Sequence, residues 1–551
     1  MEVPSDIGST ASRSPDAKSG QSQPEHEQPK WTIAVDLAAN IYDNKGQATG
    51  NGAFHKWQQL KSLADKTKDA PVSIVVSLPH VDVTSSSSED LRRNLNAFNN
   101  ISAARPDNTS APNKTLIDTF VISHGQARFV ESHLSKGFAS DLENLLGTAG
   151  KEAPSDQLAL SVFAHGYGLD LAMQGDAGAA TQQEMHDAIK RGLGNRDKLD
   201  VLDLDACQMA STDTAHNMQD VARYMVASAD DEIGDVAAKF DGQNIGAAVS
   251  DLIAHPDKSA AQFATDFVAQ ADAGLNGRPT KVPDVKNHLR TGADSLTAFD
   301  LSRYGRFEES LDKFAQALST HLTNKADLAA IAEATDNTAS YPSHLPAAVN
   351  ELRDTKQFAE RIIDQINAGK LPDDGSVRGA AQSLIANQTA MTLKQHNNPN
   401  IYRGVGGLTT FLPVTSQDSR HQMARLHSGM YLGLIELPEY QKQYRFKNLV
   451  SQTAAFIIGN ENAVMNKGLP SAAMLPLQNA LQQVQASRNQ AEYARALATM
   501  GSEATKFLNS PEGQLAVDKI AGSAHPSNGD ADRSMWSHLV DELVTGSMTS
   551  R

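Results

Sequence analysis

The chain has 551 residues, with 49 Lys and Arg against 65 Asp and Glu, which gives a formal net charge of -16. This length exceeds one ordinary globular unit, so two or three domains are expected. The acidic balance argues against the broad Lys- and Arg-rich surface that nucleic-acid-binding proteins use. No run of about 18 uncharged apolar residues predicts a membrane span, and no apolar core behind a basic cap predicts a secretory signal peptide. The single cysteine, Cys207, excludes an intramolecular disulfide and a multi-cysteine metal site.

Residues 1–30 are rich in Ser, Pro, Gln and charged residues, so we expect a disordered N-terminal arm. Residues 31–250 alternate between apolar strands and amphipathic helices. Strands are predicted at 31–40, 72–80, 115–125, 158–168, 199–211 and 222–234, and helices at 55–67, 91–98, 140–150 and 181–194. Thr181 and Glu184 form a capping box for the last helix, which Gly194 ends. This alternation predicts an α/β fold with a mostly parallel sheet flanked by helices.

The sequence pattern changes beyond residue 250. Residues 251–415 are predicted to be chiefly helical, for example at 307–322 and 380–396, with one strand at 406–414. Residues 416–551 form a second predicted helical region, and no fixed-period repeat is present. We therefore expect a catalytic α/β domain at 31–250 followed by two helical regions.

Two predicted strand ends carry reactive side chains. His165 lies in FAHGYG, and Cys207 lies 42 residues later in DLDACQM. One strand–helix–strand crossover joins them, so the strands should be parallel neighbours with both side chains at the carboxyl edge. An imidazole beside a thiol lowers the thiol pKa and can protonate a leaving amine. The backbone N–H groups of Gly166 and Cys207 are the expected donors to a developing oxyanion.

These residues resemble a known family. His165-Gly166 after one strand and Asp205-Ala206-Cys207-Gln208-Met209 after the next are similar to the clostripain family of cysteine peptidases, in the caspase-like clan. The runs WTIAVDLAAN, YMVASADDEIG and GGLTTFLPV extend the resemblance over about 31–240 and 404–414. The resemblance implies a caspase-like α/β fold, a His165–Cys207 dyad and cleavage after Arg or Lys. It also implies that Asp205 lines the S1 pocket.

One departure concerns the far wall of that pocket. Family members often carry a Gly-Trp pair shortly after the post-cysteine strand, whereas this chain has IGDVAAKF at 233–240. Asp230, Asp231 and Asp235 are therefore further candidates for a second S1 acid. The cluster Asp230-Asp231-Glu232 is either a solvated turn or a calcium site, and no regularly spaced ligand loop favours calcium. No other cofactor or metal is expected.

Alternative interpretations remain for each residue. His124-Gly125 also follows a predicted strand, but another helix and strand separate it from Cys207, so His124 is taken as structural. Cys207 alone would be interpreted as a small buried hydrophobe, and Asp205 alone as a strand-end residue capping a loop. The strand-end pairing with His165 and the Asp-Ala-Cys-x-Met context favour the catalytic interpretation.

Three function hypotheses follow. The first is a cysteine endopeptidase that acts on proteins or peptides at Arg or Lys. The second is a catalytically silent caspase-like scaffold, and the third is a bacterial effector exported without a signal peptide. The protein is therefore expected either in the cytoplasm or exported from the cell without a signal peptide. Relatives process themselves between the catalytic His and Cys, which implies a cut after Arg196 or Lys198, since both follow glycines in the loop GNRDK. The sequence does not indicate an oligomeric state.

Overall fold

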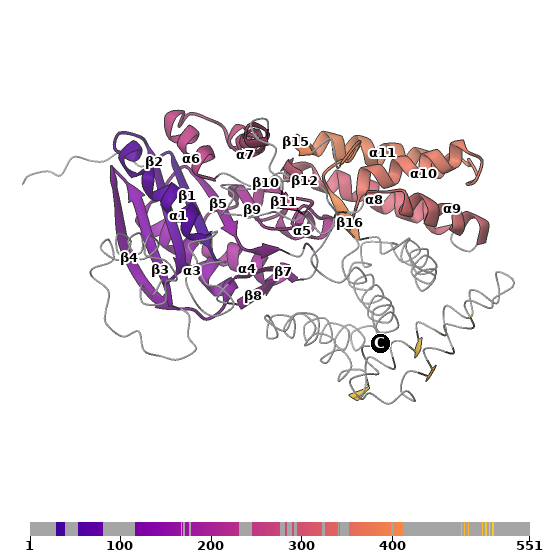
Figure 1. Ribbon diagram of the computed structural model, residues 1–551, viewed down its shortest axis with the longest axis horizontal. Coiled ribbons are helices and arrows are strands. Elements are labelled where there is room, and N and C mark those ends of the chain that lie inside the picture. The colour runs from indigo at the N-terminus through magenta and orange to yellow at the C-terminus, as the bar shows by residue number, and fades with distance from the viewer. Residues whose placement is uncertain are drawn as a thin grey trace, which may run out of the picture.

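The computed structural model describes residues 29–38, 53–80, 116–166, 171–175, 178–230, 245–275, 295–321, 325–339, 352–397 and 402–411, with isolated residues outside these ranges. Its centre is a nine-stranded sheet (Figure 1). From edge to edge the strands are β15 (Thr392–Asn397), β13 (Ser295–Asp300), β10 (Ala222–Ala227), β9 (Leu199–Asp205), β5 (Gln157–Phe163), β1 (Trp31–Leu37), β2 (Val72–Pro79), β3 (Leu116–Ser123) and β4 (Gln126–Leu134).

The five central strands are parallel, and the two strands at each edge are antiparallel. Every residue of β1, β2 and β9 is buried, as expected where helices cover both faces of a parallel sheet. The expectation of an α/β fold with a mostly parallel sheet is therefore confirmed. β4 was not predicted as a separate strand, because its alternating exposed pattern gives it no continuous apolar run.

Two sets of helices cover the sheet. On one face α3 (Phe138–Glu152), α4 (Gln182–Gly192) and α5 (Thr212–Met218) form a core with side chains such as Leu160 and Leu202. On the other face α1 (Ala53–Ser62), α6 (Ile245–Ala254) and α7 (Ala260–Leu275) enclose Ile33, Val35 and Val201. The capping box of Thr181 and Glu184 is present at the start of α4, and Gly194 takes a φ of 58° just beyond its end. Both local predictions are confirmed.

The sheet continues past residue 250. β13 pairs antiparallel with β10, and β15 pairs antiparallel with β13, although both segments lie in a part of the sequence predicted to be chiefly helical. The expected domain boundary at 250 therefore falls within one sheet rather than between two units. Each of these strands has six residues, and each gains strand structure from a distant partner, which a local pattern does not show.

Four helices gather beyond the β15 side of the sheet (Figure 1): α8 (Tyr304–Ser319), α9 (Lys325–Asp336), α10 (Thr355–Asn367) and α11 (Ser376–Met391). The strand expected at 406–414 is present as β16 (Thr409–Phe411), paired with β14 (Leu352–Asp354). Further short elements are η1 (Ala64–Thr67), β11 (Val282–Pro283), β12 (Leu289–Arg290) and η3 (Leu301–Arg303).

Several predictions fall on other parts of the chain. The N-terminal arm, the helix at 91–98 and almost all of the helical region 416–551 lie outside the described residues. Within the residues that the structure does describe, no helix is long and apolar enough to cross a membrane.

Candidate active site

His165 and Cys207 follow the ends of two neighbouring parallel strands. Phe163, the last residue of β5, is the register partner of Asp205, the last residue of β9. The N–H of Ala164 donates to the carbonyl of Asp205 at 3.4 Å. His165 and Cys207 therefore each lie two residues beyond a matched pair, at the same edge of the sheet. Both residues are partly exposed, as groups that meet a substrate must be.

Gly166 joins the two strand ends. A Cβ added to Gly166 would lie 2.2 Å from the carbonyl oxygen of Cys207, 2.9 Å from Cβ of Ala206 and 3.0 Å from the nitrogen of Cys207. These distances are shorter than van der Waals contact, so the residue after His165 lies directly against the backbone of Cys207. Only glycine permits this approach.

A small sheet follows the histidine. β6 (His165–Gly166), β7 (Leu171–Gly175) and β8 (Gly178–Thr181) pair antiparallel, with His165 opposite Gln174. The sequence predicts only a glycine-punctuated loop here, because Gly and Ala mask the alternation that marks a strand. The pairing with β7 fixes the backbone direction of His165 as it leaves the main sheet.

The loop after Cys207 has a constrained backbone. Gln208 has a φ of 60°, which is uncommon for a residue with a side chain and costs about 1 kcal/mol or more. Its N–H donates to the carbonyl of Asp230 at 3.0 Å, and the N–H of Ala210 donates to the carbonyl of Ser228 at 2.7 Å. These two bonds fix the turn on which Cys207 lies.

Asp230 is almost fully buried, and the hydroxyl of Tyr402 donates to its Oδ2 at 2.6 Å. Asp230 thus links the 402–411 segment, through its carboxylate, to the loop after Cys207, through its carbonyl. Asp231 and Asp235 lie outside the described residues. Among the side chains that the structure places, no group of three His, Cys, Asp or Glu residues could hold a metal ion.

Asp205 forms a buried ion pair that the sequence did not suggest. Nζ of Lys56 on α1 lies 2.6 Å from Oδ2 of Asp205, with side chains 3% and 4% exposed. The same ammonium lies 4.9 Å from the ring centre of Phe163. One signal could have identified it: Lys56 occupies the apolar face of its helix, at i+3 from Ala53 and i−4 from Leu60.

His124 lies far from this arrangement. His124 and Gly125 form the two-residue turn between β3 and β4, with φ values of 51° and 82°. The N–H of Gly125 donates to Oγ1 of Thr67 at 3.2 Å. Because β3 runs antiparallel to β2, this turn is at the amino edge of the parallel strands, opposite to Cys207. The structure places His165 and Cys207 at one edge of the sheet and His124 at the other.

The loop expected to be cut is also at the amino edge. Arg196 donates to the carbonyls of Ser155 at 2.5 Å and Asp156 at 3.0 Å. Lys198 donates to the carbonyl of Gln219 at 2.7 Å. These bonds hold a loop that the sequence suggested to be mobile. The seven residues of β9 separate it from Cys207 by about 23 Å.

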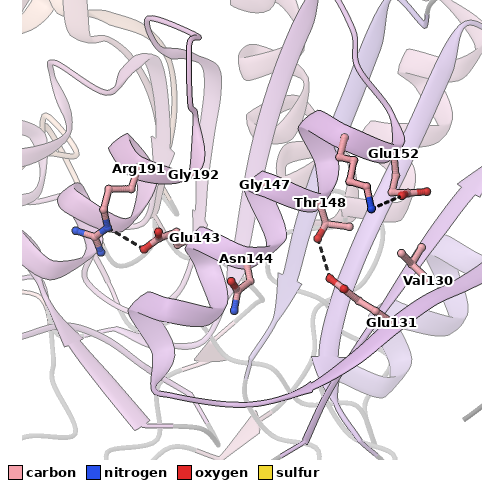
Figure 2. Close-up of a pocket in the computed structure, with 10 residues that line it drawn as sticks. Val130, Glu131, Glu143, Asn144, Gly147, Thr148, Glu152, Arg191 and Gly192 are labelled. Atoms are coloured by element: carbon pink, nitrogen blue, oxygen red, sulfur yellow. Dashed lines mark hydrogen bonds and ion pairs between the residues drawn. The ribbon is translucent and has the colours of Figure 1, made fainter. Parts of the chain in front are cut away.

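A separate pocket of about 360 Å³ lies between α3, α4 and β4 (Figure 2). Arg191 bonds Glu143 at 2.8 Å, and Thr148 bonds Glu131 at 3.0 Å within it. Its lining includes the last residues of α3 and α4, whose chain then leads into the starts of β5 and β9. The pocket is therefore at the amino edge of the sheet, away from His165 and Cys207.

Comparisons with known proteins identify the family. A secreted C11 cysteine protease from Bacteroides thetaiotaomicron, in complex with an irreversible peptide inhibitor, is 12% identical with a TM-score of 0.45, covering 73% of this chain and 98% of its own. An inactive zymogen C11 protease from Parabacteroides distasonis is 11% identical with a TM-score of 0.43, and the match covers 70% of this chain and 92% of that protein. No curated protein matches. The model of the clostripain family matches residues 123–454, more than half of the chain. The chain therefore belongs to the clostripain family of cysteine peptidases.

Proposed function

We propose that this protein is a cysteine endopeptidase that cleaves protein or peptide chains after Arg or Lys, with Cys207 as nucleophile and His165 as acid–base. The observation that carries the dyad is the matched register of Phe163 and Asp205. It is supported by the contact of Gly166 with the backbone of Cys207. Family membership supports the reaction class, and the geometry supports the choice of residues.

The proposed reaction uses side chains, backbone and water. The thiolate of Cys207 attacks the scissile carbonyl carbon, and the C=O electron pair moves to oxygen. Backbone N–H groups of Gly166 and Cys207 stabilise this oxyanion. The imidazolium of His165 donates its proton to the leaving amine as the C–N bond breaks. Neutral His165 then takes a proton from water, which hydrolyses the thioester and releases Cys207 and the acid product.

Asp205 supports the preference for a basic residue. Its carboxylate and the ring of Phe163 already contact one ammonium, that of Lys56. A carboxylate beside an aromatic face is a favourable site for Lys or Arg. Asp205→Asn alone is a poor test of this role, because it leaves the buried charge of Lys56 without its counterion.

The test compares peptides that differ only at P1, with Arg, Lys, Gln or Ala. We expect hydrolysis after Arg and Lys by wild type, and loss of turnover in Cys207→Ala and His165→Ala. His124→Ala is the matched control, because it removes a histidine at the opposite edge of the sheet. Intact hydrolysis by Cys207→Ala would refute the nucleophile, and greater loss in His124→Ala than in His165→Ala would refute the dyad. Equal wild-type rates for Arg and Ala would refute the P1 preference.

A further inference from the structure

Lys56 is a charged side chain in an apolar environment. It lies on the face of α1 that contacts the sheet, between the buried side chains of Ala53, Trp57 and Leu60. Only 3% of its side chain is exposed. Burying an ammonium without a counterion is strongly unfavourable. The ion pair with Asp205 is therefore what permits a lysine at this position.

The ammonium contacts a side chain from each of the two strands that lead to His165 and Cys207. Phe163, whose ring centre is 4.9 Å from Nζ, precedes His165 by two residues. Asp205, at 2.6 Å, precedes Cys207 by two residues. Phe163 and Asp205 are register partners, so Lys56 contacts both strands and pairs with the carboxylate that the proposed function assigns to a basic P1 side chain.

The pair also changes the local charge. Asp205 alone would present one negative charge to a substrate, whereas Asp205 with Lys56 is neutral. A guanidinium or ammonium must then share the carboxylate or displace Lys56. Either event costs free energy, and a neutral P1 side chain binds without this cost. The ion pair therefore reduces the preference for Arg over neutral residues at P1.

We propose that Lys56 is a specificity-determining residue, an internal counterion of Asp205 that competes with a basic P1 side chain. This inference rests on the proposed function. It predicts that removing the ammonium increases the preference for Arg, although the same change removes a buried ion pair and lowers the stability of the free protein.

The experiment measures alkylation of Cys207 by two peptide chloromethyl ketones that differ only at P1, Arg or Gln, with intact mass as the readout. Lys56→Met should raise the ratio of the Arg to the Gln rate by about tenfold or more. Lys56→Gln repeats the test with a neutral polar side chain if the Met variant does not fold. Lys61→Met is the matched control, since it removes a lysine from the same helix, and it should leave the ratio unchanged.

The double variant Lys56→Met with Asp205→Asn isolates the carboxylate. It removes both charges, so it should fold, and its ratio of Arg to Gln rates should fall to about one. An unchanged or lower ratio in both neutral Lys56 variants, with Arg still preferred by wild type, would overturn the role of Lys56 alone. No alkylation by either reagent in any variant, or no preference for Arg in any of them, would overturn the proposed function as well.

Discussion

Gly166→Ala tests the contact between the two catalytic strand ends. The new Cβ would lie 2.2 Å from the carbonyl oxygen of Cys207, whereas carbon and oxygen normally approach to no less than about 3.2 Å. The two backbone segments must therefore separate by about 1 Å. Two of the three nearest atoms are backbone atoms of Cys207, so this movement displaces Cys207 from His165. A misplacement of about 1 Å at a reacting group can cost about 10²-fold in rate.

We therefore expect kcat/KM for an Arg substrate to fall about a hundredfold or more in Gly166→Ala, which corresponds to about 2.7 kcal/mol of transition-state stabilisation. Gly150→Ala is the control: Gly150 lies on α3, and its added Cβ meets no atom within 4 Å. This change should raise the free energy of unfolding by about 0.5–1 kcal/mol without affecting activity. Steady-state kinetics and urea unfolding of both variants are the assays. If Gly166→Ala kept more than half of the wild-type kcat/KM, the argument from close approach would be wrong.

Three further predictions concern stability and processing. Burial raises the pKa of Asp36 from 3.8 to about 7, so the folded state retains a proton on this carboxyl group. Relative to Asp36→Asn, the free energy of unfolding of wild type should fall by up to about 4 kcal/mol between pH 4 and 7, as measured by urea titration. A difference between the two proteins that does not change with pH would contradict this prediction. Tyr402→Phe removes a hydrogen bond to the buried carboxylate of Asp230. It should lower the free energy of unfolding by about 1.5–3 kcal/mol and lower kcat. An unchanged free energy of unfolding would exclude this contribution. A cut in the loop at 194–198 should occur between molecules, so its rate should fall on dilution and wild type should cut a Cys207→Ala copy; a dilution-independent rate would exclude transfer between molecules.

The core of the fold could be predicted from local pattern. The strands that became β1, β2, β5 and β9 are almost continuously buried, because helices cover both of their faces, and in β1, β2 and β5 this burial gives a mostly apolar run. Capping at Thr181 could be predicted for a similar reason, since all of its partners are within one helical turn.

The missed elements depend on distant partners. β13 and β15 are strands because they extend the edge beyond β10. β15 begins at the residue after α11 ends, so the helical pattern of the sequence runs without interruption into the strand. Edge pairing of this kind has no short-range signature.

The placement of His165 and Cys207 at one edge of the sheet could be predicted because Cys207 is unique and because one crossover separates it from His165. The counterion of Asp205 could not be predicted from the motif, because Lys56 is about 150 residues away in the sequence and meets Asp205 only when α1 packs on the sheet. Asp36 is similar: its pKa depends on burial at the end of β1 and on one hydrogen bond, from Ser77 on β2, at 2.9 Å.

The region beyond residue 350 supports the turn that carries Cys207. Asp354, the N-cap of α10, accepts hydrogen bonds from the N–H groups of Gly406 and Gly407 at 2.7 and 2.9 Å. Two residues further on, the N–H of Thr409 donates to the carbonyl of Ala210 at 2.9 Å, three residues after Cys207. These hydrogen bonds, two to the carboxylate of Asp354 and one between backbone groups, thus connect the start of α10 with the turn after Cys207. The segment 402–411 and the start of α10 therefore support the loop after Cys207, and removing them would take away the hydrogen bond from Thr409 to Ala210.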